Sequence, residues 1–169
     1  MALSPKPSTM FDFAPDPDLG KPELYAALAD AAEAITAGEP DSVANMANVA
    51  ALIWHFVPGL NWAGFYRVVG SELVLGPFQG KPACIRIPLG KGVCGTAAVL
   101  GETQLVADVH AFPGHIACDA ASRSELVVPV MREGAVVAVI DLDSPLAAHF
   151  EAEDALGLER LAAQIASVI

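Results

Sequence analysis

The segment from Ala135 to Asp143, AVVAVIDLD, constrains the fold of this chain more than any other part of it. The segment is apolar until it ends in two acids. Successive side chains of a strand point to opposite faces, so Asp141 and Asp143 are expected on one face. Ile140 and Leu142 are then expected on the other. The segment therefore predicts a strand that buries an apolar face and presents two carboxylates at its end.

The elements around this strand predict an α+β domain. Glu125 to Met131 is its expected hairpin partner, joined through Arg132-Glu133-Gly134. Further strands are predicted at residues 61–69, 72–78, 84–87 and 104–106. Helices are predicted at about 22–37, from a cap at 41–42 to 57, at 92–100, and from about 151 onward. This order predicts an antiparallel β-sheet packed against helices.

The length of 169 residues suits one domain. We expect a proline-rich, irregular lead-in over residues 1–20 and a single domain over 21–169. No apolar run approaches the roughly 20 residues needed to cross a bilayer, and the N-terminus lacks a secretory pattern. These features predict a cytoplasmic protein with no membrane partner. The net charge of −11, with only nine basic residues, argues against a nucleic-acid partner.

Three cysteines, Cys84, Cys94 and Cys118, lie in glycine-rich or turn-rich segments. Reduced, reactive or merely buried thiols all remain open for them. Cys118 is the best candidate nucleophile because the stretch 108–124 is long and lacks strand pattern, although free cysteines are often buried. Cys94 is expected to open a short helix. The helix N-terminus would favour its thiolate, but packing under the sheet fits equally well.

Glu125, Asp141 and Asp143 are expected to meet near one strand end. Crowded carboxylates disfavour mutual ionisation, so one of them is expected to keep a proton near neutral pH and donate it to a substrate oxygen. For Asp143 alone, a strand that simply emerges into solvent is the plainer alternative. On another strand, Trp62 and Tyr66 point the same way. They predict two aromatic walls with a gap at the intervening glycine, or ordinary core packing.

A metal site is an alternative for the stretch that contains Cys118. His110, His115 and Cys118 lie close together in the sequence, with Asp108 nearby. Zinc sites usually show paired ligands at short spacing, which these residues lack. We therefore expect no metal.

Residues 61–145 resemble the free methionine-(R)-sulfoxide reductases, enzymes built on the GAF fold. The resemblance is carried by the segments NWAGFYRV, GKGVCGTAA, FPGHIACD and VIDLDSP. It implies reduction of free L-methionine (R)-S-oxide by thiols, with no bound cofactor. Cys118 matches the attacking cysteine of the family, Cys84 the usual resolving cysteine, and Cys94 a third that can join disulfide exchange.

The resemblance also implies the roles of the other residues. Trp62 and Tyr66 match aromatic walls around the substrate methyl group, and Ile116 and Ala117 are expected substrate contacts. The carboxylates matched to the sulfoxide are Glu125, Asp141 and Asp143. It further implies a sulfenic acid, an intramolecular disulfide, recycling by thioredoxin with NADPH, and a homodimer. The alternative left open is a non-catalytic GAF module that senses a small molecule.

Overall fold

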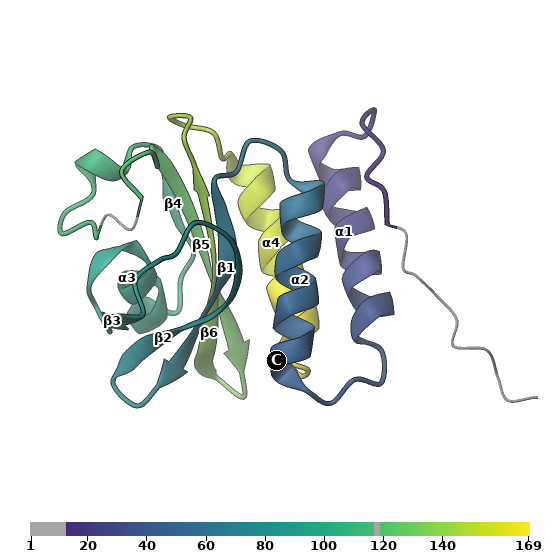
Figure 1. Cartoon of the computed structure of the whole chain (residues 1–169), viewed down its shortest axis with the longest axis horizontal. Helices are drawn as coiled ribbons and strands as arrows, with labels where there is room; N and C mark the ends of the chain where they lie inside the picture. Colours follow the sequence, from purple (N-terminus) through teal and green to yellow (C-terminus); the bar gives the residue numbers. More distant parts are fainter. Residues whose placement is uncertain (1–12, 117–118) are drawn as a thin grey trace, which may run out of the picture.

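Six strands form one antiparallel sheet in the order β3-β2-β1-β6-β5-β4. The computed structural model describes residues 13–116 and 119–169 (Figure 1). The strands are β1 (Trp62–Val69), β2 (Glu72–Gly80), β3 (Arg86–Pro88), β4 (Gln104–Val106), β5 (Ser124–Arg132) and β6 (Ala135–Ser144). The predicted α+β class with an antiparallel sheet is confirmed.

The helices are α1 (Lys21–Thr36), α2 (Ser42–Phe56), α3 (Gly92–Leu100) and α4 (Ala152–Ile165), with a 3₁₀ turn η1 (Val109–Ala111). Their ends follow local chemistry. The side chain of Asp41 caps α2 by accepting from the Ala44 amide at 2.9 Å, as predicted. Gly101 ends α3 in the left-handed region, at φ 66°. Among the described residues, no helix combines the length and apolarity needed to span a bilayer.

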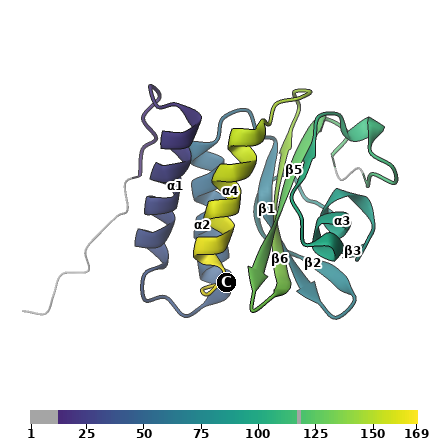
Figure 2. The same cartoon turned by 180° about the vertical axis from the view of Figure 1, so that it is seen from behind.

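The two faces of the sheet are covered differently. Helices α2 and α4 pack on one face and α1 packs outside them, whereas α3 and the loops around it lie against the other face (Figures 1 and 2). Successive side chains of a strand point to opposite faces, so neighbouring residues lie in different layers. Phe65, Ile140 and Leu142 lie in the core under the three helices. Trp62 and Tyr66 lie in the second apolar cluster, with residues of α3, and so share a face as predicted.

Strand register explains how distant acids meet. Asp143 of β6 lies opposite Trp62 of β1 on one side and opposite Glu125 of β5 on the other. The next row of the same face joins Gly64, Asp141 and Val127. Residues directly opposite in an antiparallel pair have Cβ atoms about 4.5–5.5 Å apart. The sheet therefore brings three carboxylates together on the face that α3 covers.

Most predicted elements differ from the structure by one or two residues at an end, and the difference at the third strand concerns a candidate site residue. The third strand was expected to begin near Cys84, but β3 begins at Arg86. The backbone carbonyl of Cys84 accepts a hydrogen bond from the Tyr66 hydroxyl at 2.9 Å instead of joining the sheet. Cys84 therefore lies in the turn between β2 and β3, half-buried.

Candidate active site

A pocket opens between the sheet and α3, on the face away from the three packed helices. It is lined by residues of β1, β3, β5, β6 and α3 and of the loops between these elements. Its polar and aromatic lining comprises Trp62, Tyr66, Lys81, Lys91, Cys94, His115, Asp119, Ser122, Glu125, Asp141 and Asp143, with Ile116 among the apolar residues. Seven residues predicted for the site are thus brought together. Ala117 and Cys118 lie outside the described residues.

The carboxylate cluster (Glu125, Asp141 and Asp143) has two buried members and a half-buried one, Asp143, and no lysine or arginine of the described residues forms an ion pair with it. Glu125 and Asp141 are each 6% exposed. Within residues 13–116 and 119–169, the ion pair recorded for this cluster joins Glu125 Oε2 to His115 Nε2 at 3.6 Å. Burial lowers the pKa of His115, which favours its neutral form. The cluster therefore cannot hold three negative charges at low cost.

Protonation resolves this crowding. Burial, followed by the charge of Glu125, raises the pKa of Asp141 well above its usual value. Burial and the charge of Asp143 also raise the pKa of Glu125. The hydrogen bond between Asp141 and Glu125 raises the pKa of Asp141 but lowers that of Glu125. The raised pKa values of both groups favour a proton held within the Asp141–Glu125 pair near neutral pH.

Asp143 completes the cluster near the Ser122 side chain. Burial, followed by the charge of Asp141, raises the pKa of Asp143, while a hydrogen bond with Ser122 acts in the opposite direction. Asp143 is thus part of a buried pocket. The alternative of a strand emerging into solvent is wrong.

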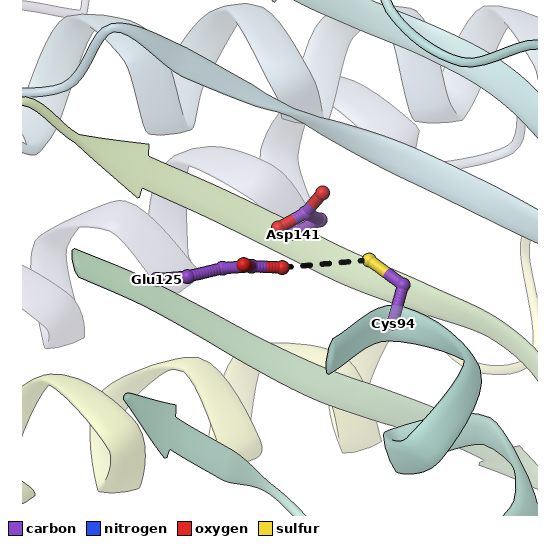
Figure 3. A group of neighbouring side chains, drawn as sticks. All are labelled: Cys94, Glu125 and Asp141. Atoms are coloured by element: carbon purple, nitrogen blue, oxygen red, sulfur yellow. Dashed lines mark hydrogen bonds between the residues drawn. The ribbon is translucent and has the colours of Figure 1, made fainter. Parts of the chain in front are cut away.

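Cys94 points from the first turn of α3 toward the carboxylates, with its Sγ 3.9 Å from Glu125 Oε1 (Figure 3). The residue is 4% exposed. Burial and the nearby charges of Asp141 and Glu125 raise the pKa of its thiol well above the usual value. These effects outweigh the helix N-terminus, which would lower it. The interpretation of Cys94 as a thiolate activated by the helix is therefore wrong.

The aromatic side of the pocket is one continuous surface. The Trp62 ring stacks on Tyr66 with centroids 5.8 Å apart and on Phe78 with centroids 5.2 Å apart. A Cβ atom at Gly64 would lie 2.4 Å from the Cβ of Phe78, so Phe78 fills the space above the glycine. The prediction of two walls separated by a glycine gap is wrong for this reason. Trp62 and Tyr66 still line the pocket together.

Two charged residues at the pocket rim were given no role by the sequence. Lys81 Nζ lies 3.2 Å from Asp119 Oδ2, and the Lys81 side chain is 71% exposed. The Ala121 amide, followed by Lys81, lowers the pKa of Asp119, so this carboxylate is charged. Asn61 Nδ2 also donates to Asp119 at 3.3 Å. We call Lys81 and Asp119 the rim pair. Both lie in segments that stood out in the sequence, but neither has a pattern that would predict their meeting.

The metal grouping considered from sequence is not assembled by the described part of the chain. His110 is exposed and does not line the pocket. Asp108 accepts from the His110 amide at 3.1 Å and so caps η1. A different set lies in the pocket: donor atoms of Cys94, Glu125 and Asp141 are all within 4.8 Å of one another.

Comparisons with known proteins identify the family of this chain. The model of the GAF domain family matches residues 33–169. The chain is 48% identical to free methionine-R-sulfoxide reductase of Escherichia coli, over 89% of this chain and 92% of that protein. It is 46% identical to the enzyme of the same name from Saccharomyces cerevisiae, over 86% of this chain and 85% of that one.

A solved structure extends the similarity to three dimensions. The free methionine-R-sulfoxide reductase of Neisseria meningitidis, in complex with its substrate, superposes with a TM-score of 0.85. It is 46% identical and covers 88% of this chain and 90% of that chain. The predicted GAF fold is confirmed by the family match and by these structural relatives. The chain belongs to the free methionine-R-sulfoxide reductase family of GAF-domain proteins.

Proposed function

We propose that this protein reduces free L-methionine (R)-S-oxide to L-methionine with its own thiols. The observation that carries the proposal is the carboxylate cluster beside an aromatic wall, where burial raises the pKa of Glu125 and of Asp141. A sulfoxide sulfur is a poor electrophile until its oxygen accepts a proton or a hydrogen bond. The homologues at 46–48% identity support the same substrate.

Asp141 is the proposed general acid. Its raised pKa keeps it protonated near neutral pH, and Glu125 holds it in place by accepting its hydrogen bond. When the sulfoxide oxygen replaces Glu125 as acceptor, the proton passes to that oxygen as the sulfur–oxygen bond breaks. General acid catalysis of this kind contributes about 10²–10⁴-fold.

Cys118 is the proposed nucleophile. Its thiolate attacks the substrate sulfur, and the protonated oxygen transfers from that sulfur to the sulfur of Cys118. Methionine leaves with the electron pair of the bond between the two sulfurs, and Cys118 becomes a sulfenic acid. A second thiol then condenses with the sulfenic acid, which forms a disulfide and releases water. Two electrons from an external dithiol such as thioredoxin, supplied by NADPH, reopen the disulfide by exchange.

Cys84 is better placed than Cys94 to resolve the sulfenic acid. Cys94 is buried among carboxylates that suppress its thiolate, whereas Cys84 is half-buried in a turn. The rim pair joins the two relevant segments, because Lys81 precedes Cys84 by three residues and Asp119 directly follows Cys118. This contact supports a Cys118–Cys84 disulfide. We also propose that the enzyme acts in the cytoplasm as a homodimer.

The test is methionine formation with three substrates: the free (R)-sulfoxide, its (S) epimer and a peptide-bound sulfoxide. We expect turnover of the free (R) form alone, measured by NADPH consumption coupled to thioredoxin and by direct assay of methionine. No turnover of any form by fully reduced protein would favour the sensing alternative. Equal turnover of the peptide would contradict recognition of the free amino acid.

Recognition of a free amino acid is assigned to the rim pair. An α-carboxylate matches the exposed Lys81 ammonium, and an α-ammonium matches the charged Asp119 carboxylate, so a zwitterion can replace the contact between them. We expect Lys81→Met to raise KM about tenfold, since hydrogen bonds to charged groups contribute about 1.5–3 kcal/mol. The kcat should stay within about twofold, because the reacting atoms lie elsewhere.

The methionine sulfoxide amide, which has no carboxylate, provides the matched comparison. The native enzyme should discriminate against this amide, and Lys81→Met should lose most of that discrimination. Lys91→Met is the second comparison, because Lys91 also lines the pocket. If Lys91→Met removes the discrimination and Lys81→Met keeps it, the assignment to Lys81 is wrong.

A further inference from the structure

The pocket between the sheet and α3 contains four potential metal donors of three chemical kinds. Figure 3 shows Cys94 from α3, Glu125 from β5 and Asp141 from β6 converging from three different elements. Their donor atoms all lie within 4.8 Å of one another. His115 Nε2 lies 3.6 Å from the other oxygen of Glu125 and supplies an imidazole nitrogen. The set comprises one thiol, two carboxyl groups and one imidazole.

The distances are close to those of tetrahedral zinc. Zinc bonds of about 2.0–2.3 Å place neighbouring donors of a tetrahedron roughly 3.3–3.6 Å apart. Cys94 Sγ and Glu125 Oε1 are 3.9 Å apart, and His115 Nε2 and Glu125 Oε2 are 3.6 Å apart. Cys94, Glu125 and Asp141 form the group within 4.8 Å, and the His115 ring would have to turn toward them to complete a tetrahedron. The mixture of sulfur, nitrogen and oxygen donors suits Zn²⁺, whereas Mg²⁺ and Ca²⁺ prefer oxygen alone.

A second observation points independently to a missing partner. Asp141 Oδ1 is fully shielded from solvent and makes no hydrogen bond within the described structure. A buried carboxylate oxygen without a partner carries a desolvation cost that a bound cation would remove. The neighbouring carboxylates add negative charge without a lysine or arginine ion pair among the described residues.

We propose that Zn²⁺ binds reversibly to Cys94, Glu125, Asp141 and His115 and inhibits the enzyme by occupying the sulfoxide end of the pocket. The cation replaces the thiol proton and any carboxyl proton, which leave to solvent. The bound ion would hold the proposed general acid, Asp141, so acid catalysis and metal binding exclude each other. The inhibitory consequence rests on the proposed function, whereas the metal site itself does not.

The first experiment isolates one thiol. The variant Cys84→Ser/Cys118→Ser keeps Cys94 as its single cysteine, and a matched variant also carries Cys94→Ser. Both are titrated with Co²⁺, whose thiolate complexes show a charge-transfer absorption. We expect this absorption, with one Co²⁺ per chain and displacement by Zn²⁺, only in the variant that keeps Cys94. Identical spectra, or no binding by variants shown to be folded by circular dichroism, would overturn the proposal.

The second experiment locates the site with two histidines of the same segment. His115→Ala, added to the variant with the single thiol, should weaken Zn²⁺ binding at least about tenfold. His110→Ala is the control and should leave the affinity unchanged, because His110 does not line the pocket. Equal weakening by both substitutions would show that the ion binds elsewhere.

The inhibition is measured in single turnover of reduced, desalted enzyme, so that no external thiol competes for the metal. Zn²⁺ should raise the sulfoxide concentration needed for half-maximal methionine formation, and a chelator should restore the original value. If the native protein turns over no sulfoxide at all, the proposed function fails while the cobalt titration still decides the metal site. Inhibition that persists unchanged in Cys94→Ser would contradict inhibition through this site.

Discussion

Asp141→Asn is expected to lower kcat/KM about 10²–10⁴-fold and, at the same time, to make the protein more stable at neutral pH. The amide can still donate a hydrogen bond to the sulfoxide oxygen, but it cannot transfer a proton. Activity therefore falls even though size and position are kept. The stability gain arises because the substitution removes a carboxyl that is costly to bury charged and crowds Glu125 and Asp143.

The stability effect has a defined dependence on pH. The folded-state pKa of Asp141 is raised by burial and by Glu125, so the folded protein binds more protons than the unfolded chain. The contribution of Asp141 is fully present below the ordinary pKa of an aspartate and is lost as pH rises toward the folded-state pKa. The free energy of unfolding of Asp141→Asn should equal that of the native protein at acid pH. As pH rises above the ordinary pKa of an aspartate, the variant should become progressively more stable than the native protein, by about 1.4 kcal/mol per unit of pKa shift.

Urea unfolding at several pH values, together with steady-state kinetics, measures both effects. Asp30→Asn is the control, because Asp30 is exposed on α1 and distant from the pocket. It should change neither activity nor the dependence of stability on pH. If Asp141→Asn loses stability at neutral pH, the carboxyl is charged and well satisfied in the fold. The assignment of the proton to Asp141 would then be wrong.

The sequence could predict the elements and the faces because these depend on local periodicity. The alternation in IDLD placed Asp141 and Asp143 on one face and their apolar neighbours on the other. The predicted helix 92–100 and strand 104–106 have the same bounds as α3 and β4. Burial of the carboxylates then followed from hairpin register, which a sequence with clear strand patterns largely determines.

The meeting of residues across loops could not be predicted in the same way. Lys81 and Asp119 are 38 positions apart and meet because two irregular segments reach the same rim. His115 lies next to Glu125, whereas the sequence grouped it with Cys118, His110 and Asp108. The filling of the space at Gly64 depends on Phe78 of β2, across the sheet. These contacts depend on how separate elements pack, and no local sequence pattern predicts them.

The pKa of the Cys94 thiol also depends on tertiary contacts that the sequence does not show. The position of Cys94 in the first turn of α3 was correctly expected. Its chemistry is decided by what α3 packs against, namely two carboxyl groups from β5 and β6. Position in an element is therefore a local property, whereas reactivity is a property of the assembled site. The three cysteines consequently need to be distinguished by experiment on each thiol.

Cys118→Ser is expected to abolish methionine formation while leaving sulfoxide binding intact, because a serine hydroxyl is not ionised near neutral pH and cannot take up the sulfoxide oxygen as sulfenic acid. Reduced variants are mixed with the free (R)-sulfoxide without external reductant, and methionine is counted per chain. Cys118→Ser should give none, although calorimetry should still show binding. Cys84→Ser should give one methionine and leave a sulfenic acid that reacts with dimedone.

Cys94→Ser is the comparison that separates the roles of the thiols. If Cys84 resolves the sulfenic acid, Cys94→Ser should give one methionine and a Cys118–Cys84 disulfide, identified by peptide mass mapping. A disulfide that fails to form in Cys94→Ser but forms in Cys84→Ser would make Cys94 the resolving residue, despite the carboxylates that oppose its thiolate. Methionine formation by Cys118→Ser would show that another thiol attacks the sulfoxide. The proposed order of steps would then have to begin at Cys84 or Cys94.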